Sequence, residues 1–249
     1  MHRIYDAHVH LSDPEYEGQL DSMITGMKRT GITACCVSMD EIDSRAVLDM
    51  AIPGTILPFV GIHPERAPGD PEAISTMLDE YSGSISGIGE IGLDPSYCTS
   101  DEDTKNQVDT FKHLLDLAEK HSKPVSIHSR GSLDDILDML ESYSLRACLH
   151  WFDGNKRSLK RALDMGLYVS YGPLAVYAAE KRSLLSRTDR DRILVETDGP
   201  VRFSRCFGRR PAHPSMVPSV IFAASAAIGT EYGETCRILE ANSRRYLGV

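Results

Sequence analysis

Eight short apolar segments recur along the chain, and each is followed by a longer polar or amphipathic stretch. The short segments are rich in Val, Ile and other residues that favour strands, whereas the longer stretches carry apolar residues at helical spacing. The strand-like segments are residues 3–9, 32–39, 56–62, 85–91, 124–129, 146–152, 167–172 and 192–197. Because strands that alternate with helices form parallel sheets covered on both faces, this order predicts a (β/α)8 TIM barrel. We expect residues 1–249 to form one such domain.

Local signals agree with this order of elements. Asp70, which precedes a proline, and Ser132 are typical helix starts, while Gly31 and Gly166 are typical helix stops before a strand. Residues 214–249 predict two closing helices. A doubly wound open sheet is the alternative, but it predicts a glycine-rich phosphate loop after the first strand, and the sequence has none there.

The overall composition limits the classes of partner. A net charge of −9 argues against a broad basic face for duplex DNA, although a local basic patch is compatible with it. No apolar run approaches the ~20 residues of a membrane span, and the first strand pattern begins at once, so we expect neither a membrane partner nor a secretory signal. The six cysteines form no CxxC motif, which predicts buried free thiols in a reducing cytoplasm.

Polar side chains with metal-binding atoms gather at the ends of the predicted strands. His8 and His10 lie two positions apart and share a strand face with Asp6, a pattern that an edge strand or a hydrogen-bonded core would also produce. The full set of such side chains along the chain decides between these interpretations. Its members at or near strand ends are His8, His10, His63, Glu90, His128, His150 and Asp198. In a TIM barrel the carboxyl ends of the strands form the active-site rim, so this pattern predicts a metal site there.

The mixture of imidazole and carboxylate groups suits Zn, Mn or Fe, or Mg if fewer histidines bind. One ion would use three or four of the groups and leave several buried polar side chains over. Two ions that share a bridging carboxylate, ~3.5–4 Å apart, would use nearly all of them. The pattern therefore favours a binuclear centre in which His8 and His10 bind the same ion.

With these residues identified, the chain resembles the TatD family of metal-dependent hydrolases in the amidohydrolase superfamily. The similarity rests on DAHVHL, GIHP, GEIGLD, SIHSR, LHWFDG and ETDGP, which occur in the family's order between residues 6 and 200. GEIGLD together with ETDGP is specific, whereas HxH alone is not.

The resemblance implies two divalent metal ions, Zn, Mn or Mg, and a role for each matching residue. The implied ligands are His8, His10 and Asp198 for one ion, His128 and His150 for the other, and Glu90 as the bridge. It assigns catalysis to Asp198 and Glu90, with Asp198 orienting or deprotonating the attacking water. His63 matches a position near the substrate, where it would contact a phosphate or simply hydrogen-bond beside the site. Family members are described as deoxyribonucleases or phosphodiesterases, so the implied substrate is a phosphodiester such as a single-stranded DNA end.

Two segments depart from the family pattern, and both are expected to line the substrate mouth. After GEIGLD the family commonly continues with aromatic residues, but here Pro95 and Ser96 precede Tyr97. After ETDGP the usual proline-rich loop with Asn-Glu-Pro is replaced by VRFSRCFGRRPAHPS. Four arginines lie between positions 202 and 210 of that loop. We expect Arg209 and Arg210 to bind substrate phosphate, the alternative being a solvated loop with surface ion pairs.

Other functions are less compatible with the sequence. A superfamily enzyme that hydrolyses a cyclic amide, or another small ester or amide, is the enzymatic alternative, but such sites often use a modified lysine where this chain has Glu90. A trinuclear phosphoesterase would usually have a histidine beside the last aspartate, and ETDGP has none. A binding module that has lost activity is disfavoured because every ligand position is filled.

Overall fold

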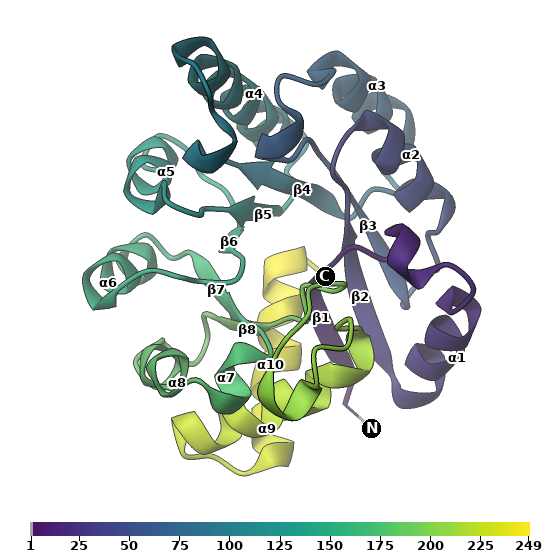
Figure 1. Cartoon of the computed structure of the whole chain (residues 1–249), viewed down its shortest axis with the longest axis vertical. Helices are drawn as coiled ribbons and strands as arrows, with labels where there is room; N and C mark the ends of the chain where they lie inside the picture. Colours follow the sequence, from purple (N-terminus) through teal and green to yellow (C-terminus); the bar gives the residue numbers. More distant parts are fainter. Residues whose placement is uncertain (1) are drawn as a thin grey trace.

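The computed structural model describes residues 2–249, and over these residues eight parallel strands follow one another around a barrel in chain order (Figure 1). The strands are β1 (Ile4–Val9), β2 (Ile32–Val37), β3 (Ile56–Val60), β4 (Gly87–Gly92), β5 (Val125–His128), β6 (Ala147–Leu149), β7 (Tyr168–Tyr171) and β8 (Ile193–Val195). Backbone hydrogen bonds join β1 to the segment just after β8: Asp198 N–H donates to His8 O at 2.9 Å, and His10 N–H donates to Gly199 O at 2.9 Å. These hydrogen bonds link the first and last strands of the barrel beside residues of the predicted site. The predicted TIM barrel is confirmed.

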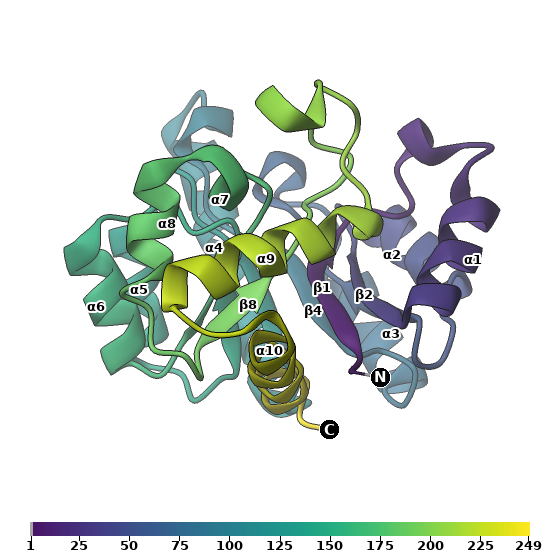
Figure 2. The ribbon, with the colours of Figure 1, turned by 90° about the horizontal axis from the view of Figure 1, so that it is seen from below.

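Helices surround the strands on the outside (Figures 1 and 2). They are α1 (Leu20–Thr30), α2 (Glu41–Asp49), α3 (Pro71–Tyr81), α4 (Asp101–Lys120), α5 (Leu133–Leu140), α6 (Lys156–Asp164), α7 (Leu174–Tyr177), α8 (Ala179–Leu185), α9 (Val217–Ile228) and α10 (Tyr232–Leu247). The predicted starts and stops agree with these bounds. Asp70 accepts a hydrogen bond from Ala73 N–H, and Gly31 ends α1 with φ 70°. Ser132 precedes α5, but its hydroxyl donates to Leu93 O at 2.6 Å instead of capping the helix.

Short 3-10 turns lie in several loops that follow the strands. They are η1 (Pro14–Tyr16), η2 (Pro64–Arg66), η3 (Pro95–Tyr97), η4 (Arg205–Phe207) and η5 (Pro214–Met216). The loop after β8, residues 199–213, projects from the carboxyl face and contains η4 (light green, top of Figure 2). Sequence variation in these loops changes the mouth of the barrel without changing the strands that support it.

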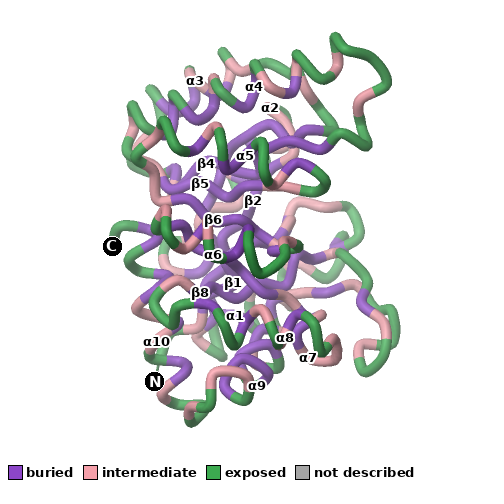
Figure 3. Tube along the Cα trace, turned by 90° about the vertical axis from the view of Figure 1, so that its left-hand side faces the viewer, coloured by how far each residue is buried: buried purple, intermediate pink, exposed green. Residues whose placement is uncertain are grey.

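The strands are buried on both faces, as Figure 3 shows by the purple trace at the centre of the molecule. One apolar cluster includes residues near the strand starts, such as Tyr5 and Tyr168, together with Phe59. Tyr246 from α10 belongs to the same cluster, and its ring lies 5.6 Å from that of Tyr168 and 6.3 Å from that of Phe59. Apolar side chains therefore fill the barrel towards its amino end, and the buried polar groups gather at the opposite end.

The cysteine prediction is correct in part. All six cysteines are free, and Cys35, Cys36, Cys148 and Cys236 are buried. Contrary to the prediction, Cys98 is only partly buried and Cys206 is exposed; Cys206 lies in the η4 turn of the projecting loop. Across residues 2–249, every helix is too short or too polar to cross a membrane.

Candidate metal centre

Two of the predicted ligands enter the barrel where strand pairing is interrupted. The β1–β2 register shifts between Asp6 and Val9, and His8 lies in that interval. The β4–β5 register shifts between Ile88 and Ile91, and Glu90 lies there. Such irregularities re-aim side chains near active sites. Both side chains are buried, His8 completely and Glu90 at 2% exposure.

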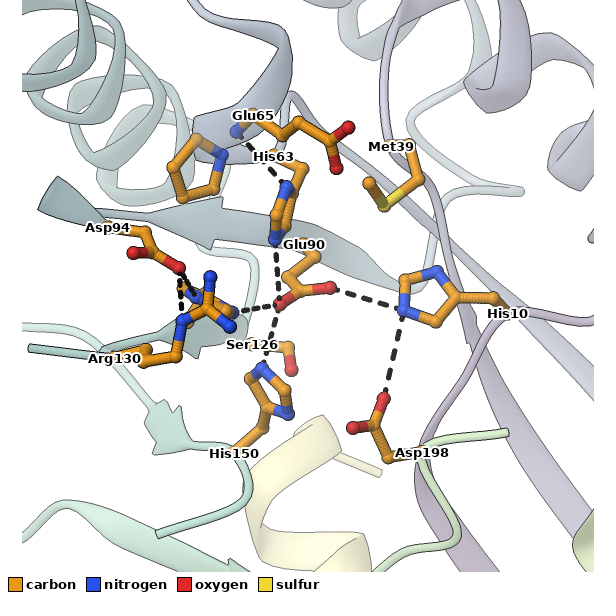
Figure 4. Close-up of polar contacts among 12 residues, drawn as sticks. His10, Met39, His63, Glu65, Glu90, Asp94, Ser126, Arg130, His150 and Asp198 are labelled. Carbon is orange, nitrogen blue, oxygen red and sulfur yellow. Dashed lines mark hydrogen bonds and ion pairs between the residues drawn. The ribbon is translucent and has the colours of Figure 1, made fainter. Parts of the chain in front are cut away.

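Glu90 is the centre of the site, and its two carboxylate oxygens face different groups of histidines (Figure 4). Oε1 lies 2.8 Å from His128 Nδ1 and 2.7 Å from His150 Nε2. Oε2 lies 3.3 Å from His8 Nε2 and 3.2 Å from His10 Nε2. The carboxylate thus divides these four histidines into two pairs, one on each oxygen.

Asp198 faces the pair formed by His8 and His10. Its Oδ1 lies 3.6 Å from His8 Nε2 and 3.8 Å from His10 Nε2. The backbone of Asp198 has φ 49°, a left-handed conformation that costs a non-glycine residue about 1–3 kcal/mol and that tends to occur at functional sites. The following residue, Gly199, has no room for a side chain, because a Cβ there would collide with the Tyr16 hydroxyl and with Ala212 O. Close packing around Gly199 therefore helps to hold the carboxylate of Asp198 at the site.

Hydrogen bonds fix the orientation of two of the imidazole rings. His8 Nδ1 lies 2.8 Å from Ser126 Oγ on β5, across the barrel, which leaves Nε2 facing the site. His128 Nε2 lies 2.9 Å from Asp94 Oδ2, which leaves Nδ1 facing Glu90. Partners of this kind fix the ring orientation of metal-binding histidines and raise their basicity.

The electrostatics of the cluster reflect burial opposed by close opposite charges. Burial raises the pKa of Glu90, but His150, His63 and His8 outweigh it and hold the pKa well below its usual range. Burial, reinforced by the neighbouring His150, lowers the pKa of His8 well below its ordinary value. Burial and the charge of Glu196 raise the pKa of Asp198 well above its ordinary value. His8 therefore presents a neutral imidazole to an ionised Glu90.

His63 has a hydrogen-bonding arrangement different from the other histidines. Its Nδ1 accepts the backbone N–H of Glu65 at 3.1 Å, so the ring proton must reside on Nε2. Nε2 points inward and lies 3.5 Å from Glu90 Oε1. Burial lowers the pKa of His63 to about 4, which keeps the ring neutral. His63 therefore presents an N–H donor to the site.

The predicted substrate residues lie in different places. His63 lines a cavity of about 390 Å³ together with residues of the Glu90 cluster such as His10 and Asp198. Arg209 and Arg210 are exposed on the loop after β8 and are not among the described residues that line this cavity. Another arginine of that loop, Arg202, forms an ion pair with Glu15 at 2.5 Å.

Sequence reasoning assigned no role to several residues that surround the cluster. Asp94 lies 2.9 Å from His128 and accepts a 2.8 Å hydrogen bond from Arg130 Nε. Glu196 is fully buried and accepts hydrogen bonds from Ser170 Oγ at 2.5 Å and from Trp151 N–H at 2.7 Å. Asp94 and Glu196 belong to GEIGLD and ETDGP, so the motifs contained the signal, and Arg130 is the last residue of SIHSR.

The donor atoms can hold metal ions. Three overlapping groups have donor atoms within 4.8 Å of one another: His8, His10 and Asp198; His8, Glu90 and His150; and His63, Glu90 and His128. Neutral imidazole nitrogens beside carboxylate oxygens are the donor set of Zn and of other divalent transition metals. His63 fits least well, because binding an ion through Nε2 would leave the ring with no proton on either nitrogen.

Comparison with known proteins identifies the family. A family model described as TatD related DNase matches residues 5–248. The 3′-5′ ssDNA/RNA exonuclease TatD of Erwinia billingiae is 27% identical over 258 residues, covering 97% of this chain and 98% of that protein. The uncharacterized metal-dependent hydrolase YabD of Bacillus subtilis is 25% identical over 266 residues, covering 99% of each protein.

A solved structure shows the same fold. The TatD homolog YJJV from Escherichia coli has a TM-score of 0.89 to this chain at 23% sequence identity, with 99% of this chain and 98% of that chain covered. At this level of identity the likeness establishes the arrangement of strands and helices.

Proposed function

The chain belongs to the TatD related DNase family and is a metal-dependent hydrolase, and from this premise we propose that it cleaves phosphodiester bonds in single-stranded nucleic acid with two divalent metal ions. The observation that carries the proposal is the division of histidines between the two oxygens of Glu90. A carboxylate that faces two separate pairs of nitrogen donors has the arrangement of a bridging ligand.

We assign one ion to His8, His10 and Asp198 and the other to His128 and His150, with Glu90 between them. The assignment follows from the contacts: Asp198 faces the pair on Glu90 Oε2, and His128 and His150 share Oε1. Imidazole and carboxylate ligands suit Zn or Mn better than Mg. When bound, a pair of divalent ions lowers the pKa of water and stabilises charge on the attacking and leaving oxygens of a displacement at phosphorus.

Asp198 is the residue we assign to the proton of the attacking water. Its carboxylate lines the cavity and faces His8 and His10 through Oδ1, so it lies where one of the ions would be held. In that position it can orient a water molecule and accept its proton, as general bases do. Glu90 is enclosed by four histidines within 3.3 Å of its oxygens, and its role is to hold the two halves of the site together.

His63 is the residue we assign to substrate contact inside the cavity. Because its Nδ1 accepts a backbone N–H, its Nε2–H is available to donate to a phosphate oxygen. Arg209 and Arg210 lie outside the cavity, so we assign them to phosphates of longer substrates that extend over the loop after β8.

The substrate class follows from the relatives and from the size of the site. A relative named as an exonuclease of ssDNA and RNA covers nearly the whole chain. A cavity of about 390 Å³ is within the ordinary range of small-ligand sites and suits a chain end better than a continuous duplex. The cyclic-amide alternative is not favoured, because the nuclease and hydrolase relatives span the chain and the fourth strand offers Glu90 instead of a lysine.

Metal content and substrate choice test the proposal together. Protein reconstituted with Mn or Zn should bind about two equivalents by elemental analysis, and Glu90→Gln should lower that number. The loaded enzyme should hydrolyse bis-p-nitrophenyl phosphate and single-stranded oligonucleotides in preference to amide and lactone substrates. A maximum of one equivalent that Glu90→Gln leaves unchanged would refute the two-metal site. Activity confined to amides or lactones would refute phosphodiester hydrolysis.

A further inference from the structure

The cavity carries an excess of acidic groups, which makes phosphate binding depend on the few cations near it. Glu65, Glu90, Asp153 and Asp198 all line it. Among the lining residues that the structure describes, Arg130 is the only arginine or lysine. Its guanidinium remains charged at any physiological pH and matches the geometry of phosphate oxygens. Arg130 is thus the one permanent protein cation on the wall of the cavity, within residues 2–249.

Three neighbours hold Arg130 in place while leaving it accessible. Its Nε donates to Asp94 Oδ2 at 2.8 Å, and its Nη2 donates to Ser96 Oγ at 2.6 Å. Its guanidinium carbon lies 5.3 Å from the centre of the Tyr97 ring, a cation–π distance. Asp94 is 1% exposed, whereas the Arg130 side chain is 59% exposed. These two hydrogen bonds use two of the five N–H groups of a guanidinium, so donors remain for a ligand.

The residues that hold Arg130 also contact the candidate metal centre. Asp94 Oδ2, which accepts from Arg130 Nε (Figure 4), also lies 2.9 Å from His128 Nε2, so a single carboxylate oxygen contacts both the guanidinium and a proposed metal ligand. Ser96 in turn donates to Asp94 Oδ1, through its hydroxyl at 2.6 Å and its backbone N–H at 3.0 Å. Holding a binding group in its bound position in advance lowers the entropy cost of binding. The presence of Pro95 and Ser96 before Tyr97 therefore has a structural consequence, because Ser96 provides one of the partners of Arg130.

We propose that Arg130 binds a phosphate oxygen of the substrate at the metal centre, and that Asp94, Ser96 and Tyr97 position its guanidinium for this contact. This inference rests on the proposed phosphodiesterase function and adds a substrate-binding residue to it. It separates two roles for arginine in this chain. Arg130 binds the phosphate inside the cavity, whereas Arg209 and Arg210 reach only substrate that extends beyond it.

Phosphate binding can be measured without turnover, because Trp151 is the one tryptophan of the chain and lines the same cavity. Inorganic phosphate titrated into the Mn-loaded protein should change the fluorescence of Trp151. Arg130→Ala should weaken phosphate binding about 10- to 100-fold, the value of a hydrogen-bonded charge pair, while Arg130→Lys should weaken it less. Arg29→Ala, on the exposed surface of α1, is the matched control and should bind as the wild type does. An Arg130→Ala protein that binds phosphate within twofold of the wild type would overturn the proposal.

Kinetics and metal content separate substrate binding from a purely structural role. With bis-p-nitrophenyl phosphate, Arg130→Ala should raise KM about tenfold or more, and added guanidinium chloride should lower it again. The metal content of Arg130→Ala should equal that of the wild type. Loss of metal from this variant would overturn the proposal, because it would assign the guanidinium to holding Asp94 and His128.

Failure of this inference can be distinguished from failure of the proposed function. Wild-type protein that binds phosphate through Arg130 but hydrolyses no phosphodiester would support the inference and refute the function. If the wild type hydrolyses phosphodiesters and Arg130→Ala leaves KM unchanged, the proposed function is supported and the inference is refuted.

Discussion

The two ends of the barrel both contain polar side chains, but these side chains are satisfied in different ways. At the amino end, Lys123 Nζ donates to Ser82 O at 2.6 Å and to Ile85 O at 2.7 Å. Arg146 likewise donates to Tyr246 O at 2.9 Å and to Ser122 O at 2.8 Å. Backbone carbonyls of the chain itself accept hydrogen bonds from both cations.

At the carboxyl end, polar groups face one another. Glu90 and Asp198 lie close together among histidines, and the buried Nδ1 atoms of His10 and His150 have no hydrogen-bond partner among residues 2–249. Unpaired buried polar groups and clustered like charges cost stability. The difference indicates which end stabilises the fold and which end binds: the amino-end cations donate to backbone carbonyls, whereas the carboxyl-end imidazoles and carboxylates face one another beside the cavity.

The strongest test of this comparison replaces the carboxyl group of Asp198 with an amide. Asp198→Asn should lower kcat for phosphodiesters by about 10²–10⁴-fold, because the amide can no longer accept the proton of the attacking water. The unfolding midpoint in urea should remain close to that of the wild type. Asp109→Asn, on the exposed face of α4, is the control and should keep full activity. Turnover within threefold of the wild type would remove Asp198 from the mechanism.

A second test measures how much metal binding at the carboxyl end stabilises the folded protein. Mn or Zn added to chelator-treated protein at 100 times its Kd should raise the free energy of unfolding by about 2.7 kcal/mol for each site that only the folded state forms. Glu90→Gln should show a smaller increase, because it loses the proposed bridge. Thermal unfolding with and without metal measures both quantities. An equal increase in the two proteins would contradict the role of Glu90.

For the amino end we expect the opposite pattern, in which a substitution lowers stability and leaves activity unchanged. Lys123→Met should lower the free energy of unfolding by about 1–3 kcal/mol, because two backbone carbonyls lose a charged donor, and it should leave kcat unchanged. Lys120→Met is the control, because its ion pair with Asp79 is exposed and should contribute little. Urea unfolding and steady-state kinetics measure the two properties. A kcat that fell with stability would show that the two ends are coupled.

The smallest effect is expected in the loop after β8. Replacing Arg209 and Arg210 with alanine should change KM for bis-p-nitrophenyl phosphate by less than about twofold, since exposed surface charges contribute little to a ligand held inside the cavity. For single-stranded oligonucleotides the same variant should raise KM and reduce the salt dependence of binding, by about 0.7 in logarithmic slope for each phosphate that the loop no longer binds. An equal rise in KM for both substrates would place these arginines at the scissile phosphate.

Much of the fold followed from local sequence pattern. Alternating apolar segments and amphipathic stretches specify parallel strands covered by helices, and a parallel barrel brings the carboxyl ends of its strands to one rim. For that reason His8 and Glu90, which are 82 positions apart in sequence, could be expected at one site. The exposure of Cys206 could not, because the height of a loop above the barrel is not encoded in its own apolar pattern.

The direction of each side chain at the rim was decided by tertiary contacts. The arginines of residues 202–210 are close in sequence, but the fold separates their surroundings: Arg202 pairs with Glu15, and Arg209 and Arg210 lie exposed outside the cavity. Arg130, a single arginine after β5, lines the cavity because Asp94 and Ser96 from the neighbouring loop hold it there. Strand positions have a fixed period of two that sequence reveals, whereas loop side chains take their directions from partners in other loops, which only the folded chain brings together.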